Sequence, residues 1–398
     1  MFAFYWKIAL LLTPGMSFAA TPSQQVTADV VVTRLTTERW RVDYTFNLPI
    51  SGLIYGPPIA SYREQAWHIL NPEVELIEEN GREMVVSRGQ LFSSLSIEVD
   101  RFTEYAHDNY APLIPFSDGG AALYLGFFTG AAIEGATEHS VDFRFQFEAL
   151  PSESVISPSN LEQRQGAYAY FGKQEPVVQS HAILLLDPAT PGWLRDSFIR
   201  VTESATQIFA DHLGYDLPER PLVIVGAGEL SLYDGYSVKG GAVGGQLVML
   251  LRGRELTDET DEVRAMFEQL TAHELAHLWQ LRMLPAGFNG EEPWLHEGGA
   301  EAMAVQVLGE SNVWNPDEVA SFGEKASESC RAALGDGTLA EATHRGNWDG
   351  VYACGFGLFQ NTEADPVSIW SALVEEARRE GSMYTQRTLD RVLSALSN

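Results

Sequence analysis

The chain has 398 residues, and its 54 acidic and 26 basic side chains give a formal net charge of −28 at pH 7. This length is enough for two domains, each with a hydrophobic core of its own. The strong negative charge argues against partners such as nucleic acid and anionic membranes, because their phosphates would repel the protein.

The first nineteen residues have the pattern of a cleavable signal peptide. Lys7 precedes a short apolar run that Pro14 and Gly15 interrupt, and the segment ends at Ala19 in a small-x-small sequence. That run is too short for a membrane anchor, and no later segment reaches eighteen apolar residues. We therefore predict residues 1–19 as a signal peptide, no membrane span after its cleavage, and an exported protein that is periplasmic or secreted.

Residues 20–150 alternate apolar and polar side chains with the period of half-buried strands. The clearest runs are Trp40, Val42, Tyr44 and Phe46, and Val141, Phe143, Phe145 and Phe147. Gly, Pro and Asn separate such runs, which predicts an all-β domain of the sandwich type. Residues 151–176 are rich in Ser, Gln, Gly and Pro, and we predict them as the linker that crosses to a second domain over 177–398.

The second domain begins with a mixture of strands and helices. The predicted elements are a strand over 177–186, a helix over 193–213 that Gly214 stops, and short buried strands over 222–225 and 246–251. Gly240, Gly241, Gly244 and Gly245 lie in a glycine-rich segment before the last of these strands. The rest of the domain reads as mainly helical, so the predicted fold class is α+β.

The sequence H-E-x-x-H occurs once, as His273, Glu274 and His277. On a helix, residues four apart share a face, so both imidazoles can bind one metal ion, and Glu274 lies about 100° round the helix. Zinc prefers such nitrogen ligands, and a nearby carboxylate can take a proton from a water that the metal activates. Glu297 follows on a second predicted helix, with nineteen residues between it and His277. We predict one zinc ion held by His273, His277 and Glu297, with Glu274 as general base.

Other interpretations of these residues stay open. The apolar residues around both histidines follow the period of a core-facing helix, so the two imidazoles could be satisfied core residues. Glu301, one turn after Glu297, could accept the N–H of a ligand histidine and fix its tautomer, or be an ordinary solvated carboxylate. The only two cysteines, Cys330 and Cys354, are predicted to form a disulfide in an oxidising compartment, with two buried thiols as the alternative.

The second domain resembles the gluzincin zinc metallopeptidases, most of all the branch of the alanyl and glycyl aminopeptidases. The matching stretches are His-Glu-Leu-Ala-His at 273–277, Trp-Leu-His-Glu-Gly at 294–298 and Tyr-Ala-Cys-Gly at 352–355. The resemblance implies a thermolysin-like catalytic domain, a peptide or protein substrate, and Tyr352 as the group that stabilises the tetrahedral oxyanion. The alternative is that Tyr352 only packs in its turn and that His344 or His296 is the donor.

The glycine-rich segment departs from the aminopeptidase pattern. In that family a glutamate in this segment holds the α-amino group of the substrate, whereas residues 240–246 contain no acid. The choice between aminopeptidase and endopeptidase is therefore open, although the four glycines can line the cleft and pair with an extended peptide. Two other functions are a non-catalytic exported zinc-containing binding protein and a zinc hydrolase of a non-peptide substrate. The acid between the histidines favours catalysis, and the sequence does not indicate an oligomeric state.

Overall fold

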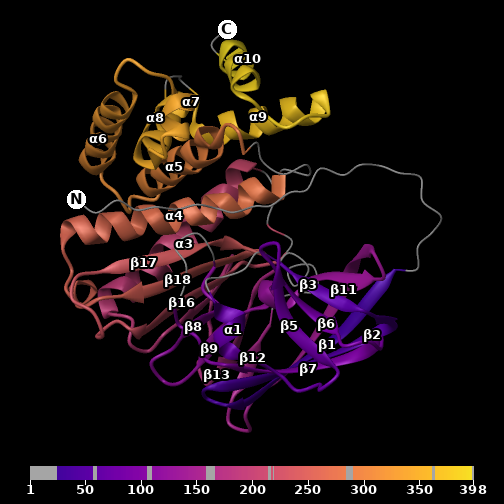
Figure 1. Cartoon of the computed structure of the whole chain (residues 1–398). Coiled ribbons are helices and arrows are strands. Elements are labelled where there is room, and N and C mark those ends of the chain that lie inside the picture. Colours follow the sequence, from indigo (N-terminus) through magenta and orange to yellow (C-terminus); the bar gives the residue numbers. More distant parts are fainter. Residues whose placement is uncertain are drawn as a thin grey trace.

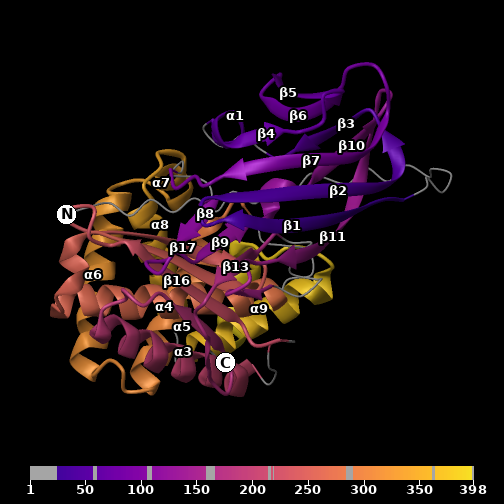
Figure 2. The ribbon, with the colours of Figure 1, turned by 90° about the horizontal axis from the view of Figure 1, so that it is seen from below.

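The computed structural model describes residues 25–56, 61–104, 110–157, 166–213, 217, 219–283, 290–360 and 364–396. The predicted signal peptide and Gly214 lie outside these residues. The chain is α+β, with a large β-rich N-terminal part and a helical C-terminal part, as the sequence predicts. Figures 1 and 2 show these two parts at opposite sides of the molecule, and the five-stranded sheet that contains β16 (Leu222–Glu229), β17 (Ser237–Val243) and β18 (Gln246–Arg252) lies between them.

The first sheet has nine strands in the order β4-β7-β2-β1-β11-β10-β3-β6-β5. Its strands are β1 (Val26–Thr36), β2 (Arg39–Ile50), β3 (Gly52–Tyr55), β4 (Trp67–Ile69), β5 (Val74–Glu79), β6 (Arg82–Ser87), β7 (Phe92–Asp100), β10 (Gly130–Glu134) and β11 (Thr137–Glu148). The short helix α1 (Tyr62–Ala66) precedes β4. Strand β2 shows how the alternation works, because Trp40, Val42, Tyr44 and Phe46 are all buried on one face.

The second sheet has the order β12-β13-β9-β8. Its strands are β8 (Leu113–Pro115), β9 (Ala121–Tyr124), β12 (Ser154–Ile156) and β13 (Tyr168–Gly172), and η1 (Leu125–Phe128) follows β9. Strands β12 and β13 lie inside the interval 151–176 that was predicted as a linker. This interval is therefore partly sheet, because four of the five buried residues of β13 pair with β9, a partner that the local composition does not reveal. The domain boundaries themselves stay a prediction.

The third sheet has the order β14-β15-β16-β18-β17. Its strands are β14 (Val177–Val178), β15 (Ile183–Leu186), β16 (Leu222–Glu229), β17 (Ser237–Val243) and β18 (Gln246–Arg252). One face packs on the helices and the other shares a core with the β-rich part of the chain. Buried Gln246 joins the two parts, since its side chain accepts from the Tyr168 N–H at 2.7 Å and donates to the Tyr168 carbonyl at 2.9 Å.

Two predicted elements of this sheet differ in the structure. The single strand predicted over 177–186 is wrong, because β14 turns back and pairs antiparallel with β15. The glycine-rich segment is the edge strand β17, and Gly244 and Gly245 form the turn into β18 with φ of 53° and 76°. Both values are positive, as a two-residue hairpin turn requires, so these two glycines serve the turn.

The helices are α3 (Gly192–Leu213), α4 (Asp261–Met283), α5 (Pro293–Glu310), α6 (Pro316–Leu334), α7 (Leu339–His344), α8 (Trp348–Gln360), α9 (Pro366–Glu380) and α10 (Gln386–Leu396), and η2 (Arg254–Thr257) precedes α4. Helix α4 lies between the third sheet on one side and α5 on the other (Figure 1). Of the helices in the described part of the chain, none has the length and apolar content that crossing a membrane requires.

Candidate metal centre

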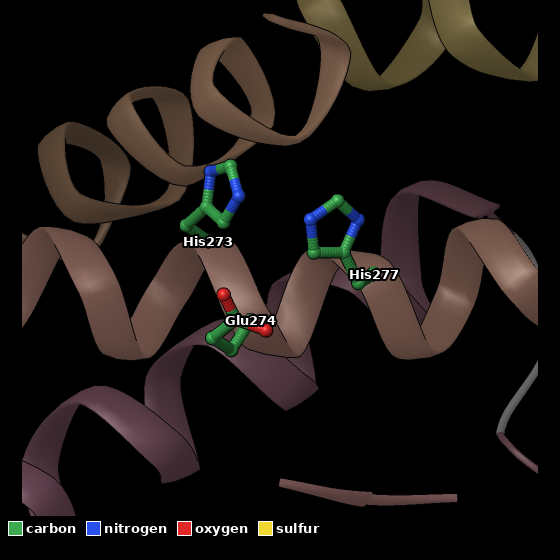
Figure 3. Close-up of side chains that lie close together, drawn as sticks. All are labelled: His273, Glu274 and His277. Carbon is green, nitrogen blue, oxygen red and sulfur yellow. The ribbon is translucent and has the colours of Figure 1, made fainter. Parts of the chain in front are cut away.

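Helix α4 carries the H-E-x-x-H residues through the core of the helical part. The helix starts after Thr260, whose side-chain oxygen accepts the N–H of Val263 at 3.2 Å. One turn of α4 separates His273 and His277, whose rings are perpendicular with centroids 4.6 Å apart. Figure 3 shows both imidazoles on one side of α4 and Glu274 on another. The i, i+4 spacing therefore brings both imidazoles to one site, as the sequence predicts.

Glu297 of α5 reaches the same point from the opposite side. Its Oε2 atom lies 3.2 Å from Nε2 of His277 and 3.4 Å from Nε2 of His273. In a tetrahedral zinc site with bonds of about 2.0–2.1 Å, neighbouring ligand atoms lie about 3.3 Å apart. The three atoms are of types that zinc binds, and the two distances from the Glu297 oxygen to the imidazole nitrogens match those between neighbouring zinc ligands.

Glu274 is also close, since ligand-type atoms of His273, Glu274 and His277 lie within 4.8 Å of one another. Its Oε2 atom, however, accepts the backbone N–H of Ala242 on β17 at 2.9 Å. This bond holds the carboxylate against the edge strand, whereas Glu297 contacts both Nε2 atoms. The geometry thus favours Glu297 as the third ligand and leaves Glu274 beside the site.

Each histidine is held by a second partner at its other ring nitrogen. Nδ1 of His273 lies 2.9 Å from Oε2 of Glu301, which also accepts from the side chain of Gln269. Nδ1 of His277 lies 2.7 Å from Oε1 of Gln280. A proton on each Nδ1 satisfies these acceptors and leaves each Nε2 lone pair free for a metal.

The sequence indicated the position of Glu301 but not that of Gln280. The amide of Gln280 also donates to the carbonyl of His296 at 3.0 Å, so it ties His277 to the start of α5. Its place three residues after His277, on the same side of the helix, was the one signal available. Glutamine has no part in the metal-binding pattern, so this signal is weak.

Charges in the buried site favour a cation. Burial opposes the charged form of His273, but hydrogen bonds to Glu297 and Glu301 outweigh it and raise the pKa of His273 to about 10. Burial would likewise raise the pKa of the Glu297 carboxyl, but the charge of His277 and hydrogen bonds from both histidines hold it well below its usual range. The Glu297 carboxylate therefore keeps its negative charge and stabilises positive charge beside it.

His296 lies beside the centre rather than in it. Its ring stacks on His277 with centroids 4.6 Å apart, and its Nδ1 lies 3.1 Å from the hydroxyl of Tyr384. Burial, reinforced by the charge of His277, lowers the pKa of His296 to about 3. The ring is thus neutral and packs against His277.

Tyr352 of α8 lies over the centre, with its ring centroid 5.5 Å from that of His273. Burial, followed by the charges of Glu297 and Glu274, raises the pKa of Tyr352 well above its usual range, so the phenol keeps its proton. Together with His273 and Glu274 it lines a pocket of about 330 Å³ between α4, α5, α6 and α8. The phenol of Tyr352, which interacts with Glu297, therefore belongs to the lining of the cavity next to the histidines.

Comparisons with known proteins agree with this architecture. No protein-family model and no curated protein sequence matches the chain. Its structure is similar to that of an aminopeptidase N family protein from Idiomarina loihiensis, with a TM-score of 0.61 and 12% identity over 93% of this chain and 73% of that one. The chain has a gluzincin aminopeptidase-like fold.

Two further structures are similar over most of this chain. An M1 zinc metallopeptidase from Deinococcus radiodurans has a TM-score of 0.49 and 13% identity, covering 94% of this chain and 90% of that one. A yeast LTA4 hydrolase has a TM-score of 0.48 and 12% identity, covering 95% and 67%. The fold assignment rests on the Idiomarina protein alone.

Within this aminopeptidase-like fold, the other predicted site residues lie at different distances from the centre. His344 is exposed at the end of α7 and is not among the residues that line the pocket. Gly240 and Gly241 lie in β17, two and one residues before Ala242, whereas Gly244 and Gly245 belong to the hairpin turn. The placement favours Tyr352 over His344 as the donor, and Gly240 and Gly241 over the turn glycines as cleft residues.

The disulfide joins two helices that form the pocket of this aminopeptidase-like fold. Cys330 of α6 and Cys354 of α8 are bonded, with their Cα atoms 4.7 Å apart. Ser329 and Ala353, the preceding residues, both line the pocket. The bond therefore fixes the spacing of two of the four helices around the cavity.

Proposed function

We propose that this chain is an exported zinc peptidase with a thermolysin-like catalytic domain, in which His273, His277 and Glu297 hold one zinc ion. One observation carries the proposal. Both Nε2 atoms meet one oxygen of Glu297, while each Nδ1 is bonded to another partner. Two core histidines that only needed hydrogen bonds would not require a second buried carboxylate between them.

Glu274 has the position of a general base. A bound zinc would supply Lewis-acid polarisation of the scissile carbonyl and of the attacking water. The Ala242 N–H holds one oxygen of Glu274, so the carboxylate is oriented before substrate arrives. Glu274 then takes a proton from the attacking water and delivers it to the leaving amine.

Tyr352 is proposed to stabilise the oxyanion that forms on the scissile carbonyl. Its phenol keeps its proton, because burial and the carboxylates around it raise its pKa. A neutral O–H beside the site can donate to charge that appears only in the transition state. The two proposed roles are thus divided between a carboxylate on α4 and a phenol on α8.

The substrate is proposed to be an extended peptide that lies along β17. This strand is at the edge of its sheet, and the N–H of Ala242 points outward to Glu274. Gly240, two residues earlier, presents its main chain on the same outward side. Because no acid occurs in Ser237–Val243, this strand has no carboxylate for a free α-amino group, and we propose cleavage within chains as well as at their ends.

A peptide-library digest tests the function. The zinc-loaded protein is expected to cleave peptides, to stop when a chelator is added, and to lose at least about 100-fold in rate as Glu274→Gln while keeping its zinc. Glu262→Gln, an exposed acid in the first turn of α4, is the matched control and should keep the parental rate. Zinc binding without any cleavage would instead support a binding protein, and cut positions separate exo- from endopeptidase activity.

Export is proposed from the signal-peptide pattern and from the disulfide, which forms and persists in oxidising compartments. The mature protein should then begin at Ala20. Mass spectrometry of protein recovered from the periplasm or the medium measures this directly. An intact N-terminus on protein that stays in the cytoplasm would contradict the proposal.

A further inference from the structure

We propose that the pocket between α4, α5, α6 and α8 selects an acidic substrate side chain, preferably glutamate, with Lys325 as its counter-charge. This inference rests on the proposed peptidase function, because it concerns the substrate residue next to the scissile bond. Three features of the pocket carry it: its continuity with the metal centre, its apolar walls, and a lysine that forms no ion pair with any residue that the structure describes.

The pocket opens directly from the proposed catalytic residues. His273, Glu274 and Tyr352 form part of its lining, and its volume of about 330 Å³ is ample for one side chain. A peptide positioned for attack at this site must place a neighbouring side chain in or across this cavity. The pocket is therefore placed to bind the side chain of one residue next to the scissile bond.

The walls of the pocket are mainly apolar. Its apolar lining residues are Met266 and Leu270 from α4, Phe322 and Ala326 from α6, and Ala353 from α8. Such walls favour a side chain with a methylene stem, since burying each methylene stabilises binding. Glutamate has two methylene groups before its carboxylate, so these methylene groups can contact the apolar walls while the carboxylate reaches a positive charge in the lining.

Lys325 supplies the positive charge at this cavity. It lies in α6, it lines the pocket, and it has no ion pair within 4.0 Å among the residues that the structure describes. The helix does not need it for capping, because Asn315 and Glu318 form the capping box. Ser329 lies one turn later on the same face, so its hydroxyl is a second hydrogen-bond donor beside the ammonium group.

Three carboxylates also line the pocket, those of Glu274, Glu301 and Asp349, and each has a structural explanation. Glu274 accepts the backbone N–H of Ala242, and Glu301 pairs with His273. Asp349 is the third. It lies in the first turn of α8, where an acid stabilises the positive end of the helix dipole. The negative charge of the whole chain also opposes an acidic substrate. Salt screens charges beyond about 8 Å at physiological ionic strength, whereas a carboxylate inside the pocket meets Lys325 at close range. The local ammonium therefore decides the preference.

The test measures binding rather than turnover. Two peptides that differ only by Glu or Gln next to the bond to be cleaved are titrated against the zinc-loaded Glu274→Gln protein by calorimetry. We expect roughly tenfold or tighter binding of the Glu peptide, as charged hydrogen bonds provide. Lys325→Met should bring the ratio of the two affinities to about one. Lys325→Glu should make the protein bind the Gln peptide more tightly than the Glu peptide, and it should favour a third peptide with Lys at this position.

Two control variants make the result specific. Lys173→Met removes the same charge from an exposed position outside the pocket and should leave the Glu-to-Gln ratio as it is. Asp349→Asn should increase the ratio, because it removes one of the three competing carboxylates. An equal ratio for the parent and Lys325→Met, or no preference for Glu in the parent, overturns the proposal.

Turnover by the parent enzyme separates this proposal from the peptidase function. If the Glu peptide binds more tightly in a way that depends on Lys325, but the parent cleaves neither peptide, the peptidase function is rejected and the pocket for an acidic side chain is supported. If both peptides are cleaved at rates that do not depend on Lys325, the peptidase function is supported and the pocket for an acidic side chain is rejected.

Discussion

Gly298 of α5 packs directly on Gly355 of α8, and neither position has room for a side chain. A Cβ atom on Gly298 would overlap the Cα of Gly355, and a Cβ on Gly355 would lie 2.8 Å from the Cα of Gly298. Glu297 precedes the first glycine, and Tyr352 lies about one turn before the second. This helix crossing therefore sets the distance between the proposed third ligand and the proposed oxyanion donor.

We predict that Gly355→Ala destabilises the protein by roughly 1–3 kcal/mol, because the added methyl group forces α5 and α8 apart. Gly357→Ala is the matched control on the same helix, since a Cβ there meets no atom within 4 Å. It should be neutral or stabilise by up to about 1 kcal/mol. Urea unfolding of both variants measures the difference, and equal stability would contradict the close crossing.

The metal-ligand assignment predicts that His273→Ala and Glu297→Ala each lose zinc. Each change removes one of the three proposed ligand atoms, which are the two Nε2 atoms and Oε2 of Glu297. Zinc held by only two protein ligands is bound far more weakly. Elemental analysis after dialysis gives the zinc content per chain. His212→Ala, a partly exposed histidine of α3 that pairs with Glu310, should keep one zinc. Parental zinc content in both ligand variants would reject the assignment.

Gln280 is predicted to support the metal through His277. Gln280→Ala removes the acceptor that fixes the His277 tautomer, and such changes weaken metal binding by about 10- to 100-fold. Competition with a chelator of known affinity measures the zinc dissociation constant. Gln207→Ala, an exposed glutamine on α3, serves as control and should leave the constant unchanged. A parental constant for Gln280→Ala would assign this glutamine to packing alone.

The sequence predicts the metal helix well because spacing along a helix fixes geometry. His273 and His277 must share a face whatever surrounds them, and Glu301 follows Glu297 by one turn. The edge strand β17 was not foreseen, since Gly240 and Gly241 disfavour strands in isolation. Its pairing with β18 overrides that preference, as neighbouring strands commonly do.

Contacts between distant segments explain the other differences. Strand β13 pairs with β9, more than forty residues earlier, and the local composition of 151–176 carries no sign of that partner. The pocket likewise combines Leu270, Lys325 and Ala353 from three helices. No periodicity within one helix indicates that these three residues share a cavity.

Tyr352→Phe tests the proposed oxyanion donor. Loss of the hydroxyl should lower kcat by about 100- to 1000-fold, because a donor to the transition-state charge is removed. Zinc content should stay at the parental level, since the phenol is not one of the three proposed ligands. His344→Ala, the exposed alternative on α7, should retain the parental kcat. The reverse pattern in the steady-state kinetics would transfer the role to His344.

The disulfide is predicted to position Tyr352 as well as to stabilise the fold. Cys354 follows Tyr352 by two residues on α8, and its bond to Cys330 fixes α8 against α6 along the pocket. Misplacement of a catalytic group by about 1 Å can lose about 100-fold in rate. Cys330→Ser should therefore lower kcat more than it lowers zinc content, and it should also destabilise the chain by about 3 kcal/mol. Kinetics and elemental analysis of the same preparation compare the two effects. Unchanged kcat in a folded Cys330→Ser protein would limit the bond to a structural role, and free thiols in the non-reduced parent by mass spectrometry would reject it.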